Sequence, residues 1–574
     1  MKFFITFIFV LGSLFFLSTM THADTFTVDS TDDEVDADPG DGYCRTSMIP
    51  KLDGSYECTL RAAVMETNAW SGDDTIILPT GNYTLTISGD DAEAEMGDLD
   101  ITDAVSIEGD STSWSDVVID GGALDRVFQV WSASTSVSFS NLTIQNGSTA
   151  SHGGGIYASV DGSGELNLTN VLIQNNTSIM LGGGISITNG DGTYTLTVDS
   201  SEISNNSIIG GSSYSGHGGG IYVANSTIPV VIQNSTISNN YVYSMYGSHG
   251  GGISGDTITI TDSNISDNTM ETTSGASGGG VYGDSITISS SVISGNLITA
   301  VDDSYGGGVY GGEELTITDS TISNNMINSQ DVGYGGGVAL IGNDTLTISN
   351  STISGNSLIL GVSGSGGGLY GGRNVTITNS TFSGNSVQAV TRASAGGIFT
   401  NYDTVDIINS TIADNKITAF ASFGSGLSID GGKLSNVILA DNKANGTESK
   451  DCEGTIDTLT SSIIEHLTSR CTVSSGTPIE SDPRLKTLDD NGGPTYTQAI
   501  TRLSPAYNQG DATVCSAFSY DQRGSGYSRT VGTSCDMGAY EVQSTFSTFP
   551  KEGGFEFPGG GPGTGFPWGD LPKH

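Results

Sequence analysis

Basic residues are scarce in this chain of 574 residues: 19 Lys and Arg stand against 63 Asp and Glu, for a formal net charge of −44. Nucleic acid is therefore excluded as a partner, because affinity for phosphate comes from Lys and Arg. An anionic membrane surface would repel the chain for the same reason. No Lys or Arg occurs between Arg126 and Arg373, so this long stretch of the chain offers no cation to an acidic substrate.

Long apolar runs are missing apart from residues 3–17, which follow Lys2 and precede the small residues Thr21 and Ala23. This order predicts a secretory signal peptide over 1–23 and no transmembrane segment after its removal. An uncleaved anchor helix is the alternative, but the run is short for one. We therefore expect an exported protein.

Cysteine is missing between Cys58 and Cys452, and the six cysteines flank this stretch. Export permits disulfides. The simplest connectivity joins neighbours in sequence, although six cysteines allow fifteen pairings. In the loop-entropy model each such bridge stabilises the fold by about 3 kcal/mol. A zinc site is the alternative, but none of the spacings fits one. The predicted bridges are Cys44–Cys58, Cys452–Cys471 and Cys515–Cys535.

Glycine, in contrast, is abundant, and much of it recurs as GGG followed by Ile, Val or Leu, first at Gly153 and last at Gly366. A second mark is an aliphatic residue or Phe, two further residues and then Asn. The asparagines follow one another at 27 to 34 residues, which predicts a stacked repeat of about thirty residues. They are Asn176, Asn206, Asn240, Asn268, Asn296, Asn325, Asn356, Asn385, Asn415 and Asn442.

One copy of the repeat, residues 306–325, contains three short pieces in which β-branched residues alternate with polar ones. Such alternation predicts strands, and the Gly, Asp, Ser and Asn between them predict tight turns. Three short strands per repeat, stacked repeat on repeat, predict an all-β parallel β-helix whose interior holds Val309, Leu315, Ile317 and Ile322. The asparagines from Asn240 to Asn385 are expected to form an internal ladder of amide hydrogen bonds.

The two ends depart from the repeat, as the caps of a solenoid must. Residues 24–70 are acidic and contain a short amphipathic helix over 59–68, with Thr59 as its N-cap. We expect repeats over 71–442, with irregular first rungs over 71–140. A disulfide-containing C-terminal cap is expected over 443–543 and a flexible Gly/Pro-rich tail over 544–574.

Several stretches carry a resemblance to known families. CTLRAAVMETNA at 58–69, after the acidic segment 26–44, resembles the N-terminal motif of CSLREA-domain proteins. The repeats are similar to those of polymorphic outer membrane proteins, and the stretch 482–541 resembles the choice-of-anchor Q domain. The resemblance implies a right-handed parallel β-helix of the pectin-lyase-like type, exported by bacteria, associated with the outer membrane or extracellular, and adhesin-like.

Few residues of the repeats are candidates for catalysis. A lyase needs a base and cations near the substrate carboxylate, and within the later repeats only Arg373, Arg392, Lys416 and Lys433 are basic. A glycosidase needs one pair of carboxyl groups. Aspartates such as Asp262 and Asp319 instead recur at equivalent turn positions. No catalytic residue is predicted.

Two weaker metal sites remain open. His217 and His249 each precede a GGG and fall on neighbouring repeats, so they could hold a transition metal, although a plain surface stack is the simpler interpretation. An acidic loop near Cys44 could bind calcium as a cofactor or could stay a solvated loop. The calcium candidates are Asp32, Asp33, Asp36, Asp38 and Asp41.

The sequence thus predicts a secreted or cell-surface rod with a structural or adhesive role. It would present loops such as 207–217 and 241–249 to a polysaccharide or to a protein on a host or neighbouring cell. The alternative is a polysaccharide lyase or glycosidase, and a third interpretation is a passive envelope layer.

Overall fold

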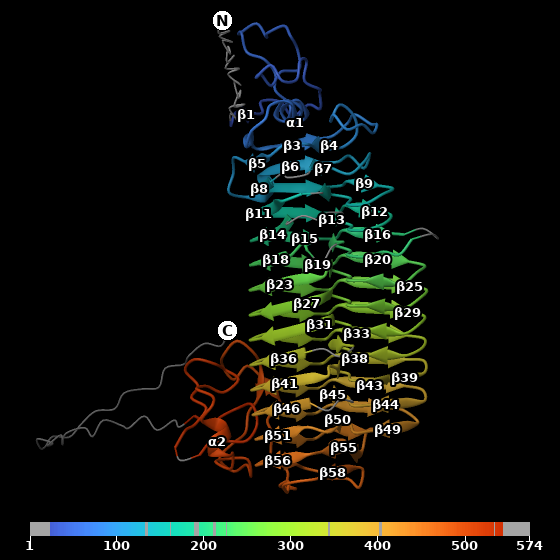
Figure 1. Cartoon of the computed structure of the whole chain (residues 1–574), viewed down its shortest axis with the longest axis vertical. Coiled ribbons are helices and arrows are strands. Elements are labelled where there is room, and N and C mark those ends of the chain that lie inside the picture. Colours follow the sequence, from blue (N-terminus) through green and yellow to red (C-terminus); the bar gives the residue numbers. More distant parts are fainter. Residues whose placement is uncertain are drawn as a thin grey trace, which may run out of the picture. The chain divides into compact units, whose positions relative to one another are not determined.

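The computed structural model describes residues 23–543, apart from 133–135, 161, 189–193, 211–213, 225–226, 342–344, 401–403 and 533. Residues 1–22 of the predicted signal peptide and the predicted tail over 544–574 lie outside this range. The described chain is an all-β parallel β-helix, as predicted. Its coils stack with their strands side by side (Figure 1).

Three columns of strands together form one 39-stranded sheet. The first column, which follows the GGG corner, consists of β4 (Leu99–Ile101), β7 (Phe128–Ser132), β10 (Ile156–Val160), β13 (Ile185–Thr188), β17 (Ile221–Val223), β22 (Ile253–Ser254), β27 (Val281–Ser289), β31 (Val309–Thr318), β35 (Val338–Leu340), β40 (Leu369–Gly371), β45 (Ile398–Phe399), β50 (Leu427–Asp430), β55 (Cys452–Ile456) and β58 (Cys471–Val473). The second consists of β1 (Thr25–Thr27), β2 (Asp74–Leu78), β5 (Val105–Gly109), β8 (Ser136–Gln145), β11 (Gly164–Gln174), β14 (Tyr194–Asp199), β18 (Val230–Gln233), β23 (Thr257–Thr261), the later parts of β27 and β31, β36 (Thr345–Ser349), β41 (Asn374–Thr378), β46 (Thr404–Ile408), β51 (Lys433–Ser435) and β56 (Thr458–Thr460). The third consists of β3 (Gly81–Thr84), β6 (Val117–Asp120), the ends of β8 and β11, β15 (Glu202–Ser204), β19 (Thr236–Ser238), β24 (Asn264–Ser266), β28 (Val292–Ser294), β32 (Thr321–Ser323), β37 (Thr352–Ser354), β42 (Thr381–Ser383), β47 (Thr411–Ala413), β52 (Ile438–Ala440) and β57 (Ile463–Ile464).

Two further sheets complete each coil. The 12-stranded sheet contains β9 (Ser148–Thr149), β12 (Thr177–Ser178), β16 (Ser207–Ile209), β20 (Tyr241–Ser244), β25 (Thr269–Thr272), β29 (Leu297–Ala300), β33 (Met326–Ser329), β38 (Ser357–Leu360), β43 (Ser386–Ala389), β48 (Lys416–Thr418), β53 (Lys443–Ala444) and β54 (Glu448–Ser449). The 7-stranded sheet contains β21 (Ser248–His249), β26 (Ala276–Ser277), β30 (Ser304–Tyr305), β34 (Gly333–Tyr334), β39 (Ser363–Ser365), β44 (Arg392–Ser394) and β49 (Ala421–Phe423).

The three strand pieces predicted in residues 306–325 are confirmed, since they form β31 and β32. The interior prediction is also confirmed: Val309, Leu315, Ile317 and Ile322 are buried and lie in register with equivalent residues of the next coil. The variable part of the repeat adds strands that the sequence pattern did not show. The segments 207–209 and 241–244, expected as loops, belong to the 12-stranded sheet.

The asparagines of the repeat run through the interior as one column of hydrogen bonds. In each step the side-chain oxygen of one Asn accepts hydrogen bonds from the backbone N–H and the amide nitrogen of the Asn in the preceding coil. For Asn296 donating to Asn325 these distances are 3.1 and 2.9 Å. The column continues from Asn176 to Asn442 and ends on the carboxylate of Asp451, which takes the place of the next Asn.

The GGG corner packs against this column. A Cβ added at Gly308 would lie 2.8 Å from both the amide nitrogen of Asn325 and the carbonyl oxygen of Gly337. The backbone can therefore approach the asparagines only without side chains. The buried aliphatic residues of the repeats form two separate clusters, and a third cluster lies where the C-terminal segment packs on the last coils. Of the two clusters in the repeats, Ile317 belongs to the larger and Ile327 to the smaller.

A second ladder, built from serines, lies at the turn before the third column. The backbone N–H of Ser291 donates to the hydroxyl of Ser320 at 3.1 Å, and this hydroxyl donates to the carbonyl of Thr318 at 2.7 Å. The residue before each of these serines adopts positive φ, as Asp319 does at 50°. Aspartates at these positions therefore form turns, in line with the sequence pattern.

The N-terminal segment covers the first coils. Helix α1 (Leu60–Ala69) begins one residue after the expected N-cap Thr59, whose side chain accepts a hydrogen bond from the N–H of Ala62. Arg61 is buried, pairs with Asp33 at 2.6 Å and donates to the carbonyl of Gly97. The helix is thereby fixed to the loop before β4. A short 3₁₀ helix, Trp114–Asp116, follows β5.

The coils continue beyond residue 442, where the repeat spacing predicted their end. Strands β55 to β57 pair in parallel with β50 to β52, and β58 pairs in parallel with β55, although their sequence has lost the GGG and Asn marks. The following segment, with β59 (Leu488–Asp489), β60 (Thr497–Gln498) and α2 (Ala512–Cys515), lies beside the later coils (Figure 1). There Gln522 donates to the hydroxyl of Thr352 at 2.9 Å. The three disulfides are those predicted, Cys44–Cys58, Cys452–Cys471 and Cys515–Cys535.

Candidate functional site

Two columns of outward-facing residues border the GGG corner, one on each side. The residue just before the corner and the second residue after it fall in register with their equivalents in neighbouring coils, as Tyr305 does with Tyr334 and Tyr282 with Tyr310. Aromatic rings or imidazoles occupy most of these positions. We call these rings, together with Trp131, whose ring contacts that of Tyr157, the aromatic track: Trp131, His152, Tyr157, His217, Tyr222, His249, Tyr282, Tyr305, Tyr310, Tyr334, Tyr370, Phe399 and Phe423.

Rings in the track stack along the coil axis, because neighbouring strands lie about 4.8 Å apart. The centroids of Tyr282 and Tyr310 are 5.0 Å apart with planes inclined by 5°, and those of Tyr370 and Phe399 are 5.2 Å apart at 3°. Ring contacts run without a break from His217 to Phe399. Since the stacked faces cover one another, the middle of the track presents mainly ring edges and hydroxyls to solvent.

The histidine pair belongs to this stack. The rings of His217 and His249 are parallel within 10° at 4.8 Å, and Nδ1 of His217 accepts the backbone N–H of His249. Lone pairs of imidazole lie in the ring plane, so two parallel rings cannot direct them at one ion. Burial lowers the pKa of His217 to about 4, which keeps it neutral at pH 7. The structure therefore favours the surface stack over a transition-metal site.

The C-terminal end of the track is different, because cations and an exposed ring gather there. The guanidinium carbons of Arg392 and Arg470 lie 4.5 and 5.0 Å from the ring centroid of Phe423. Phe420, three residues earlier, is 94% exposed. A hollow of about 340 Å³ beside Phe423 is also lined by Lys450 and Arg470. We call Arg392, Phe420, Phe423, Lys450 and Arg470 the basic groove.

A second hollow of about 240 Å³ joins the basic groove to the track. It is lined by Tyr334, Tyr370 and Phe399 together with Arg392. Arg392 lines this second hollow and also lies over the ring of Phe423, which lines the first. Its strand, β44, pairs with β39 and β49, so the backbone of the 7-stranded sheet fixes its place. The contact between Arg392 and Phe423 thus links the linings of the two hollows at the last part of the track.

Sequence reasoning found only part of this site. Arg392 was among the four basic candidates, but Arg373, Lys416 and Lys433 lie on other strands or turns and do not line the groove. Lys450 and Arg470 were missed, since they lie past the last recognisable repeat and were assigned to a cap. The signal that remained was charge: they are basic residues in a strongly acidic chain.

The opposite end of the track contains buried carboxylates. Nε1 of Trp131, which is 42% exposed, donates to Asp100 at 2.9 Å, and Asp98 pairs with Arg126. Burial raises the pKa of Asp98 to about 7 and that of Asp100 to about 6. Both carboxylates are covered by protein, so this end offers no open acid–base pair to a substrate.

These raised values predict a fold that is more stable in mild acid. Burial also raises the pKa of Asp451 to about 6 and that of Glu541 to about 8. The folded state then binds more protons than the unfolded state between about pH 4 and 8, so stability is lost as pH rises through this window. The histidines of the track, with lowered pKa values, oppose this trend only below about pH 6.5. We expect the Tm to be several degrees higher at pH 6 than at pH 8.

Scanning calorimetry of the wild type and Asp100→Asn tests this expectation. The amide keeps an oxygen for Trp131 and removes a buried charge, so the variant should gain stability at pH 8 and show a flatter pH profile. Asp430→Asn, at an exposed position, is the control. A Tm that falls from pH 8 to pH 6 would contradict the prediction.

The predicted calcium loop does not gather its carboxylates around one point. Asp33 is paired with Arg61, and Asp41 with Arg45, while Asp36 accepts backbone N–H groups from Asp38 and Arg45. Asp32 is exposed. Arginines and amides thus compensate most of the charge that a hard cation was expected to neutralise.

Among the described residues, one other group has ligand atoms close enough for a metal ion: Asp451, Glu465 and His466. Both oxygens of Asp451 are already used, one by Asn442 and the other by the backbone N–H of His466. Asp451 therefore ends the asparagine ladder, and both of its oxygens already accept hydrogen bonds.

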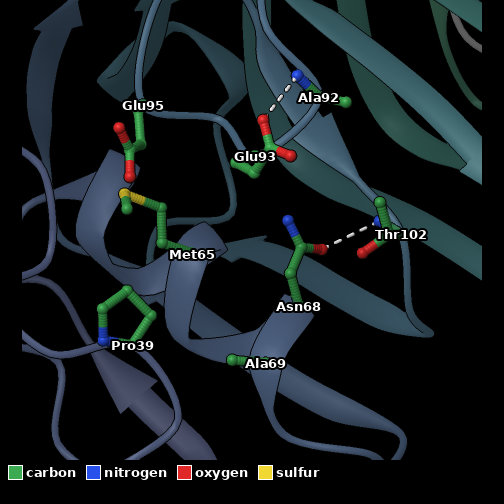
Figure 2. A pocket seen from close by; sticks show the side chains of 8 residues that line it. All are labelled: Pro39, Met65, Asn68, Ala69, Ala92, Glu93, Glu95 and Thr102. Atoms are coloured by element: carbon green, nitrogen blue, oxygen red, sulfur yellow. Dashed lines mark hydrogen bonds between the residues drawn. The ribbon is translucent and has the colours of Figure 1, made fainter.

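A further hollow, of about 280 Å³, lies between helix α1 and the loop before β4 (Figure 2). Asn68 projects into it, but its amide is occupied by the backbone of Asp100 and Thr102, at 2.7 and 2.8 Å. Glu93 accepts a hydrogen bond from the N–H of Ala92. This hollow is a seam between the cap and the first coils, and its polar groups serve the backbone.

No helix in the described part of the chain is long and apolar enough to span a membrane.

A comparison with known protein families agrees with the fold. A family model described as right-handed beta helix region matches residues 308–477. A similar solved structure is the A-module of the mannuronan C-5 epimerase AlgE6 of Azotobacter vinelandii, at 14% identity, covering 73% of this chain and 96% of that chain, with a TM-score of 0.23. A likeness this low carries no argument about activity. The search of curated proteins gave no match.

Proposed function

We propose that this protein is an exported β-helix rod that binds polysaccharide along the open surface at the C-terminal end of the aromatic track. The observation that carries the proposal is the contact of Arg392 with the ring of Phe423, since these two residues line two separate hollows, with the exposed ring of Phe420 three residues before Phe423. Aromatic faces pack against the apolar C–H faces of sugars, and polar groups at the rim bind their hydroxyls. A surface that follows the coil axis suits an extended polymer.

Binding is favoured over turnover by the groups that line the groove. The carboxylate there, Glu453, forms an ion pair with Arg470 at 3.2 Å. A lyase or glycosidase would need a carboxylate or other base free to move a proton. The prediction of export to a bacterial surface, and the resemblance to adhesin-like families, support an adhesive role for such binding.

Removing the exposed ring should weaken binding. We expect Phe420→Ala to reduce affinity for a bound polysaccharide about fivefold, because an exposed aromatic platform contributes on the order of 1 kcal/mol. The control is Tyr243→Ala, which removes an outward aromatic ring from β20 on another face. Affinity electrophoresis of the full chain in gels containing polysaccharide measures the change. Equal retardation of both variants and the wild type would contradict the site.

A further inference from the structure

The groove concentrates positive charge on a strongly negative protein. Arg392, Lys450 and Arg470 line or border it, and Glu453 is the carboxylate among its lining residues. No Lys or Arg occurs between Arg126 and Arg373, so the earlier part of the track has no such charge. A neutral ligand would need none of these cations.

The arginines are also arranged to receive an anion. Both guanidinium groups lie within 5.0 Å of the same ring centroid, that of Phe423, and the ring limits their movement. Arg470 is paired with Glu453, whereas Arg392 has no carboxylate at ion-pair distance among the described residues. Its side chain is exposed on β44. A planar guanidinium held in this way can donate two parallel hydrogen bonds to a carboxylate or sulfate.

We infer that the groove selects a polysaccharide bearing carboxylate or sulfate groups, which Arg392 binds directly while the sugar rings pack against Phe420. This inference rests on the proposed function and adds the charge class of its ligand. The ammonium group of Lys450, which donates to the carbonyl of Ser422 at 3.3 Å, is a further positive charge in the lining of the hollow beside Phe423. The negative charge of the remaining chain repels those parts of a polyanion that lie close to it outside the groove. At physiological salt this repulsion extends over about 8 Å.

The test uses the full exported chain at pH 7 and 150 mM salt, with three immobilised polymers: polygalacturonate, dextran sulfate and neutral dextran. The wild type should bind one or both charged polymers at least about tenfold more tightly than dextran. Arg392→Gln should lose about tenfold on the charged polymers, a larger loss than on dextran. Arg470→Gln should lose less, since its charge is shared with Glu453. The two charged polymers distinguish carboxylate from sulfate as the bound group.

Arg373→Gln is the matched control, because it removes the same charge from an exposed position after β40. Arg392→Lys keeps the charge but loses the planar group, and should retain only part of the affinity. Thermal unfolding of each variant checks that the fold is intact. Equal affinity for dextran and the charged polymers, or no loss in Arg392→Gln, would overturn this inference and leave the proposed function standing. No retention on any of the three polymers would count against the proposed function itself.

Discussion

Replacing Asn325 with alanine is expected to lower the free energy of unfolding by about 3–5 kcal/mol. The side-chain oxygen of Asn325 accepts two hydrogen bonds from Asn296, and its amide nitrogen donates to the carbonyl of Ile293 and to the side chain of Asn356, at 2.9 and 3.0 Å. All of these groups are buried. Alanine leaves both donors of Asn296 and the carbonyl of Ile293 without a partner in a site closed to solvent.

Urea unfolding of the full chain measures this loss. The matched control is Asn328→Ala in the same coil, because Asn328 points outward from β33 and is exposed. The control should change stability by less than about 0.5 kcal/mol. If both variants unfold at the same urea concentration as the wild type, the ladder contributes little and the coil is stabilised by its aliphatic residues alone.

The asparagine ladder could be predicted because each coil repeats the same residue at the same place, and a periodic mark in a stacked fold must form a column. The serine ladder has the same cause but was missed. Serines such as Ser291 and Ser320 stand among many other serines of the repeat, so the sequence gives no sign of which ones are buried. Only the register of the strands identifies them.

The candidate site was harder to predict because it depends on where different segments meet. Arg392 and Phe423 occupy successive coils, but Lys450 and Arg470 come from the region in which the repeat marks have disappeared. Their position follows from β55 and β58, which continue the parallel pairing without GGG or Asn. The contact between Gln522 and Thr352 likewise joins distant segments through polar side chains that no periodicity indicates.

The close packing of the GGG corner against the asparagine ladder leads to the second prediction with a large expected effect, a loss of stability. Across the ten corners from Gly153 to Gly424, the first glycine is once replaced by Ala395 and the second once by Ser425. The third is glycine in every corner. Ala395 adopts φ 48°, so the first position tolerates a Cβ with the backbone in the left-handed region. A Cβ added at Gly306, in the first position, would meet the carbonyl oxygen of Val309 in the same coil, whereas a Cβ at the third position would meet the asparagine ladder and the next coil.

We therefore expect Gly308→Ala to destabilise the fold by about 3 kcal/mol or more, because the added methyl must displace either the amide of Asn325 or the backbone of Gly337. Gly306→Ala, at the first position of the same corner, should also destabilise the fold, because its Cβ would lie 2.3 Å from the carbonyl oxygen of Val309. We expect a smaller loss, about 1–2 kcal/mol, since Ala395 occupies the equivalent position of a later corner and the added methyl displaces no asparagine of the ladder. Gly247→Ala is the neutral control, since its Cβ would meet nothing closer than 3.5 Å. Urea unfolding of the three variants gives the order. If Gly306→Ala is the most damaging, the requirement for glycine at the corner comes from the left-handed backbone at the first position. Close packing on the asparagines would then not be its main cause.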